Sequence, residues 1–381
     1  MFCNRVRWNL EPNALARLVS EKHGDELLDL TESNPTRTGL DYPSQAMVHA
    51  LADAKALIYT PHARGMRSAR EAISGYYDFR VPPERILLTA STSEAYGWVF
   101  KLLANPGDEV LVPRPSYPLF EFLAELESVH VVQYPLLYDH GWFIDFDALE
   151  SLINGRTRAI VIVNPNNPTG SYAKAQELEH LAEICRRRDL AIISDEVFAD
   201  FDFGPDPNRV TSLVNFNDVL VFSFSGLSKV AGMPQMKLGW IVISGPEDLR
   251  RDADSRLELI ADTYLSVGAP VQCAAKTLMA AGAAIREQIR HRTARNLAFV
   301  RERIKSTAFS ILDIEGGWYA ILQVPGIRSE EEWTIELLRR QNVLVQPGYF
   351  YDFGREAFLV LSLLTPEAVF SEGIARLLAL E

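Results

Sequence analysis

The stretch AIVIVNPNNPTGSYAKAQELEHLAEICRRRDLAIISDE, residues 159–196, decides the fold class of this chain. It begins and ends with short apolar runs, AIVIV and AIIS, that have the length of fully buried strands. Between them, AQELEHLAEICRRR repeats its apolar residues at the three- and four-residue spacing of a helix. A strand, a helix and a second strand in this order predict parallel strands in a sheet that helices cover on both faces.

The same alternation of short apolar runs and helical stretches continues on both sides. The further runs that predict strands are ILLTA (86–90), EVLVP (109–113), HVVQYP (130–135), VLVFSFS (219–225) and WIVIS (240–244). We therefore expect an α/β fold with a mostly parallel, mixed seven-stranded sheet sandwiched by helices.

The length of 381 residues predicts more than one domain, because a single hydrophobic core rarely serves so long a chain. A long helical stretch over about 270–306 is followed by a shorter pattern of mixed strands and helices. We expect a large domain over residues 42–280, and a smaller α+β domain formed by residues 1–41 and 281–381.

Composition and charge narrow the class of partner. The chain is 48% hydrophobic and 23% charged, as globular proteins are, and its net charge is -12. An acidic surface repels phosphate backbones and anionic lipid, so we expect neither nucleic acid nor a membrane as partner. The three cysteines are far apart, and the chain shows no signal-peptide pattern and no apolar run of membrane-spanning length, which favours the cytoplasm. No metal site is expected.

Three polar residues follow predicted strands, and in open α/β sheets ligands bind at these carboxyl ends. Asn167 lies in the turn NPNNPTG, Asp195 ends the run AIISDE, and Lys229 closes the run SGLSK. A carboxylate that ends an apolar strand needs a partner. Desolvation of an amine in such surroundings lowers its pKa, and the neutral amine that results is nucleophilic.

Each of these features also has a simpler explanation. NPNNPTG suits any tight turn, Asp195 suits a helix N-cap, and Lys229 suits a surface lysine whose stem lies on apolar neighbours. The run Ser91-Thr92-Ser93-Glu94 follows the strand ILLTA and opens a helix, where its hydroxyl and backbone N–H groups form either an anion site or an ordinary cap.

The order and spacing of these residues are more specific than any one of them. Asn167, Asp195, Lys229 and Lys237 lie 28, 34 and 8 residues apart in turn. With NPNNPTG and SGLSK, this series strongly resembles the class I and II aminotransferase family, the fold-type I enzymes that use pyridoxal 5'-phosphate. The resemblance runs over most of the chain and implies the family's large and small domains.

The resemblance implies a role for each matching residue. Lys229 would form a Schiff base with the cofactor aldehyde and later carry the substrate's α-proton, while Asp195 would pair with the pyridine nitrogen. Asn167 would bind the ring hydroxyl oxygen, and Tyr117, in PRPSY, would stack on the ring. The residues that would hold the phosphate are Thr92, Ser93, Ser225, Lys237 and, across the interface of a homodimer with shared active sites, Tyr59.

Three positions depart from the family pattern. Lys237 stands where relatives have arginine, which keeps the charge but loses the bidentate fork. Phe198 stands where a tyrosine usually donates to the cofactor ring oxygen. Val360, in FLVLS, stands where an arginine clamps the substrate carboxylate. In the loop SNPTR we name Asn34 and Arg37 as candidate substrate-binding residues, although a solvent-exposed charge is the alternative for Arg37.

Transamination between an amino acid or amine and a keto acid is therefore the expected activity. A lyase, decarboxylase or racemase reaction on the same cofactor is the alternative, and the missing arginine favours it. A ligand-sensing regulator is a third reading, against which the acidic charge counts. Five aromatic residues line either an apolar pocket or an interface between domains: Trp318, Tyr319, Tyr349, Phe350 and Tyr351.

Overall fold

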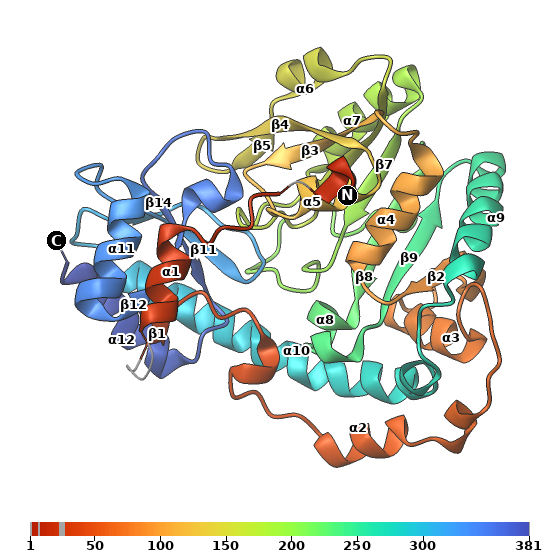
Figure 1. The fold of residues 1–381 in the computed structure, drawn as a ribbon, viewed down its shortest axis with the longest axis horizontal. Coiled ribbons are helices and arrows are strands. Elements are labelled where there is room, and N and C mark those ends of the chain that lie inside the picture. Colours follow the sequence, from red (N-terminus) through yellow and green to blue (C-terminus); the bar gives the residue numbers. More distant parts are fainter. Residues whose placement is uncertain (1, 7, 23–26, 381) are drawn as a thin grey trace.

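The computed structural model describes residues 2–6, 8–22 and 27–380, and its centre is an eight-stranded mixed sheet (Figure 1). In spatial order the strands are β2 (Ile86–Thr89), β9 (Gly239–Ser244), β8 (Val221–Gly226), β7 (Ala191–Asp195), β6 (Thr157–Val163), β3 (Glu109–Arg114), β4 (His130–Tyr138) and β5 (Trp142–Ile144). The run from β8 to β4 is parallel, whereas β9 and β5 are antiparallel to their neighbours. The α/β class and the mostly parallel sheet are thus confirmed.

The sheet has one strand more than the seven predicted. All seven predicted strands are present, and the eighth, β5, has only three residues. It pairs with the end of β4 across a tight turn in which His140 and Gly141 have positive φ angles of 49° and 152°. A strand of this length does not stand out in an apolar-run pattern.

Alternate residues of the strands face two separate cores, as the period of two requires. On one face Val110, Val112, Val161 and Ile193 belong to a cluster that packs against α4 (Thr92–Leu103), α5 (Phe120–Leu126) and α9 (Glu247–Tyr264). On the other face a second cluster contains the strand residues Leu111, Ile160, Ile162 and Ile192. They pack with residues of α6 (Phe146–Leu152) and α7 (Ala175–Arg188).

A second body with its own core lies beside the large sheet (Figure 1). Its four-stranded antiparallel sheet has the order β10 (Ser310–Ile311), β11 (Tyr319–Gln323), β14 (Phe358–Ser362) and β13 (Gln346–Pro347). The helices α1 (Ala14–Glu21), α11 (Glu330–Gln341) and α12 (Glu367–Leu378) lie beside this sheet (Figure 1). The short strand β1 (Leu28–Asp29) pairs with β12 (Val343–Leu344), which attaches the N-terminal segment to the C-terminal part of the chain.

The helix α10 (Ala269–Arg303) connects the two bodies (Figure 1). Its first half packs against α2 (Ser44–Leu51) and α3 (Arg67–Tyr76), and its last turns join the core of the second body. We propose the division into residues 42–280 and residues 1–41 with 281–381, with α10 shared, because the two bodies have separate cores. Of the helices in the described ranges, none combines the length and apolar character that crossing a bilayer requires.

The helix α10 also supports the short helix α8 (Leu227–Val230), which carries Lys229. Gly282 of α10 faces Ala231 so closely that an added Cβ would lie 2.5 Å from the Cβ of Ala231. Side chains cannot pack at that distance, so the glycine permits the close approach of the two helices. The packing of α10 against Ala231 therefore helps to fix the position of Lys229, two residues earlier in the chain.

Candidate active site

Lys229 lies just beyond β8, and its amine is surrounded by aromatic rings. The Nζ atom is 4.7 Å from the ring centroid of Trp318 and 5.3 Å from that of Phe198. Desolvation in these surroundings lowers the pKa of Lys229 to about 8, against the opposing effect of the Asp195 charge. A neutral and therefore nucleophilic amine is accessible near neutral pH.

Asp195 ends β7, the parallel neighbour of β8, and is buried. Burial raises its pKa to about 6, while the Val197 N–H, the Tyr96 hydroxyl and the Lys229 charge act in the opposite direction. The Tyr96 hydroxyl donates to Oδ2 over 3.1 Å, and the Val197 backbone N–H donates to Oδ1 over 3.3 Å. The buried carboxylate and the desolvated amine therefore lie at the same edge of the sheet.

The asparagines of NPNNPTG have different environments. Asn164 accepts from the Ala173 N–H and donates to the Val210 carbonyl, so its amide is used within the fold. Asn166 accepts from the Ser116 hydroxyl and donates to the Pro115 carbonyl. Only Asn167 keeps a buried amide oxygen, Oδ1, with no partner among the described residues.

A second group of unused polar atoms lies where β8 ends and α4 begins. The buried hydroxyl of Ser225 has no partner in the described part of the chain. Ser91 caps α4 by accepting from the Glu94 N–H over 3.2 Å, so Thr92 and Ser93 open the first turn of this helix. Backbone N–H groups at such a helix start favour an anion.

Other predicted site residues are more open to solvent. Tyr117 is partly buried, and burial raises its pKa to about 12. Lys237 is exposed, in a left-handed conformation with φ 50°. Arg37 is exposed and has no ion pair among the described residues, whereas the Asn34 side-chain oxygen accepts from the Thr36 N–H over 3.1 Å.

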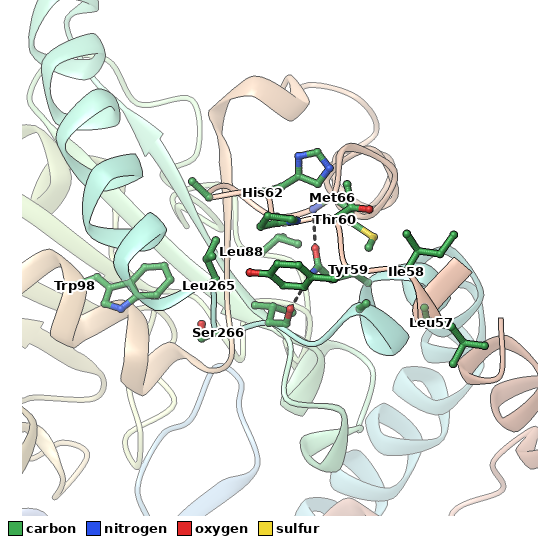
Figure 2. Close-up of a pocket in the computed structure, with 17 residues that line it drawn as sticks. Leu57, Ile58, Tyr59, Thr60, His62, Met66, Leu88, Trp98, Leu265 and Ser266 are labelled. Atoms are coloured by element: carbon green, nitrogen blue, oxygen red, sulfur yellow. Dashed lines mark hydrogen bonds between the residues drawn. The ribbon is translucent and has the colours of Figure 1, made fainter. Parts of the chain in front are cut away.

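Tyr59 lies outside the Lys229 surroundings, on the wall of a separate cavity of about 200 Å³ (Figure 2). This cavity is bounded by the segment that precedes α3 and by Leu88, Trp98, Leu265 and Ser266. Tyr59 is 80% exposed. Within the single chain, the structure does not bring this residue to Lys229.

Residues 25–376 of the chain match the family model of aminotransferase class I and II. The chain belongs to this family. It is 29% identical to the glutamate-pyruvate aminotransferase AlaA of Haemophilus influenzae, over 91% of this chain and 87% of the relative. It is 26% identical to the human tyrosine aminotransferase, over 98% and 87%. An alanine aminotransferase from Pyrococcus furiosus has the same fold, with a TM-score of 0.87 at 24% identity over 100% and 99% of the two chains.

These findings confirm the predicted family and activity. The chain is an aminotransferase that depends on pyridoxal 5'-phosphate and moves an amino group between an amino acid and a keto acid. The described residues fit this cofactor, because Asn167 Oδ1 and Ser225 Oγ are buried polar atoms that still need a partner. A carboxylate and a desolvated amine are the groups that its ring nitrogen and its aldehyde require.

Two contacts at this site were not foreseen from the sequence. The Tyr96 hydroxyl donates to Asp195, and a signal for it exists, because Tyr96 lies one helical turn after Thr92 on α4. Trp318 approaches Lys229 from the second body, and its buried indole N–H has no acceptor among the described residues. Trp318 therefore lies beside the Lys229 amine, and it comes from the second body, so it belongs both to the site and to the interface between the bodies.

The substitution Asp195→Asn tests the electrostatic link between the two central groups. It removes the negative charge that raises the pKa of Lys229, so we expect that pKa to fall below about 8. The measurement is the pH dependence of trinitrobenzenesulfonate labelling at Lys229 in cofactor-free protein, read by mass spectrometry. Asp218→Asn, at an exposed position, is the control. A midpoint that stays unchanged or rises in Asp195→Asn contradicts the link.

The same shift has a consequence for stability. The ordinary pKa of a lysine is 10.5, so between about 8 and 10.5 the unfolded chain binds a proton at Lys229 that the folded chain does not. Through this group the stability of the cofactor-free fold therefore rises with pH across that window and is lost as pH falls through it.

Proposed function

We propose that Lys229 holds the cofactor through a Schiff base and moves the substrate's α-proton once the substrate amine has displaced it. The observation that carries this proposal is the desolvated amine beside the buried carboxylate of Asp195. An amine with a pKa of about 8 releases and accepts a proton readily near neutral pH. When bound, pyridoxal phosphate supplies an electron sink for the bond that breaks.

The neighbouring residues hold and orient the ring in this proposal. Asp195 would accept a hydrogen bond from the ring nitrogen, and the Tyr96 hydroxyl donates to the same carboxylate. Asn167 binds the ring oxygen, and Tyr117 stacks on the ring face. The phosphate group is held by Thr92, Ser93, Ser225 and Lys237, and unpartnered Ser225 Oγ supports this set.

We further propose a homodimer in which Tyr59 reaches the phosphate of the other subunit. The support is an exposed apolar segment, because Leu57 is 87% exposed and Tyr59 is 80% exposed, with Val48, Ile58 and Phe79 also exposed. Surface clusters of this kind mark interfaces. We expect sedimentation to give twice the chain mass of 42.8 kDa, and Ile58→Asp to give a monomer with weakened cofactor retention. A wild-type monomer that retains the cofactor contradicts the proposal.

The cytoplasm remains the proposed location, supported by the free cysteines. Cys3 is exposed, Cys273 is partly buried and Cys185 is buried, and they form no disulfide in the described residues. Free exposed thiols persist in a reducing compartment.

For the substrate, we propose an amino acid with an apolar side chain whose carboxylate is held by Arg37. Val360 is fully buried and shares an apolar cluster with Trp318, Tyr319 and Phe198. It cannot bind a carboxylate. Two relatives are named for alanine and tyrosine, whose side chains are uncharged, and another is named a glutamate-pyruvate aminotransferase.

Replacing Arg37 by alanine tests how the carboxylate is bound. A bidentate pair contributes about 2–3 kcal/mol, so kcat/KM for an amino acid should fall roughly 30- to 140-fold. Arg301→Ala, at an exposed position of α10, is the control. Steady-state kinetics with alanine and tyrosine measure the effect, and an Arg37→Ala enzyme with unchanged kcat/KM would remove Arg37 from the site.

Incubation with an amino acid alone tests the reaction. We expect one equivalent of keto acid per subunit, an equal amount of aminated cofactor, and then no further turnover until a keto acid is added. Lys229→Ala should form neither product, because the group that transfers the proton is gone. Continued release of product without an acceptor would instead indicate a lyase.

A further inference from the structure

A cavity of about 310 Å³ lies at the junction between the β4–β5 hairpin and the second body. Its apolar lining residues include Trp142, Leu312 and Phe358, which are buried and form a small hydrophobic cluster separate from the larger cores. The Trp142 and Phe353 rings are 6.2 Å apart between centroids, and the Phe353 and Phe358 rings are 4.9 Å apart. A ligand with an apolar body would therefore meet aromatic side chains among the residues that line the cavity.

The charged residues that line this cavity are both arginines. Arg114 follows from the end of β3, and Arg355 comes from the loop before β14. Both are exposed, no Asp or Glu lines the cavity, and neither arginine has an ion pair in the described part of the chain. The guanidinium carbon of Arg355 is 5.3 Å from the ring centroid of Phe358. Two like charges at one cavity favour an anion between them.

Two further donors lack acceptors of their own. Trp142 is only 8% exposed, and its buried indole N–H has no acceptor among the described residues. The Tyr138 hydroxyl, on the same strand pair, accepts from the backbone N–H of Asp313 over 2.9 Å. Its own O–H remains able to donate. A buried donor without an acceptor is uncommon and calls for a partner.

We propose that this cavity binds an organic carboxylate with an apolar or aromatic body, held by Arg114, Arg355 and the Trp142 indole N–H. Guanidinium groups match a carboxylate with paired hydrogen bonds, and the aromatic walls receive the body of the ligand. Inorganic phosphate matches the charge but leaves the apolar walls uncovered.

This binding site is separate from the proposed catalytic centre. None of Lys229, Asp195, Asn167 and Val360 lines it. Arg114 and Trp142 belong to the large sheet, whereas Arg355 and Phe358 belong to the second body. A bound carboxylate therefore contacts both bodies at once and stabilises their present arrangement.

Calorimetric titration of the holoenzyme with phenylacetate tests the proposal, with neutral phenylacetamide and inorganic phosphate as comparison probes. We expect phenylacetate to bind more tightly than either, with the cofactor absorption spectrum unchanged. The double variant R114Q/R355Q should weaken phenylacetate binding at least tenfold. Trp142→Phe keeps the aromatic wall, loses the N–H, and should weaken binding about threefold.

Arg301→Gln is the matched control and should bind phenylacetate as the wild type does. Melting temperatures establish that each variant is folded. Equal affinity for phenylacetate in R114Q/R355Q and wild type, or equal affinity of wild type for acid and amide, would overturn the proposal. Because heat of binding is measured rather than turnover, failure here is distinct from failure of the proposed catalytic roles.

Discussion

Asp195 and Lys229 place a carboxylate and an amine together where water is largely excluded, and most of the site follows from this constraint. Burial moves both pKa values toward the neutral forms, and with the opposing contributions included they lie at about 6 for Asp195 and about 8 for Lys229. The charged carboxylate persists because the Tyr96 hydroxyl, the Val197 N–H and the Lys229 charge oppose that shift. In the proposed roles, the ring nitrogen and the aldehyde of the cofactor would use these two groups, which already lie together in the chain alone.

The fold holds this pair from three directions. The parallel pairing of β7 with β8 sets Asp195 opposite Phe224, five residues before Lys229. From below, Gly282 brings α10 against Ala231. The second body packs against the same region. There Gly316 lies so near Phe201 that an added Cβ at Gly316 would be 2.6 Å from the Phe201 carbonyl oxygen. That approach carries Trp318 over the Lys229 amine, so neither body forms the site alone.

The sequence predicted the elements whose signal is local. Seven strands were recognisable because each contains a short, largely apolar run, and the residues after them were predicted to lie together because carboxyl ends of parallel strands share one edge. Strand β5 was missed because three residues are too few to show the alternation of apolar and polar residues that indicates a strand. The contacts of Tyr96 and Trp318 depend on how helices and bodies approach, which no spacing encodes. For the same reason nothing in the pattern NPNNPTG shows that Asn167, and not Asn164 or Asn166, keeps a free amide oxygen.

Val360 stands at the position where the family resemblance implies an arginine, and this one side chain changes how a substrate carboxylate can be bound. Alternation along β14 sends Leu359 and Leu361 into the core of the second body, and it sends Val360 toward the cluster of Phe198, Trp318 and Tyr319. A guanidinium at that buried point would need a carboxylate partner to offset its desolvation. With valine there, the aromatic cluster closes without a ligand. In our proposal the carboxylate is held instead by Arg37, which is exposed and has no ion pair among the described residues.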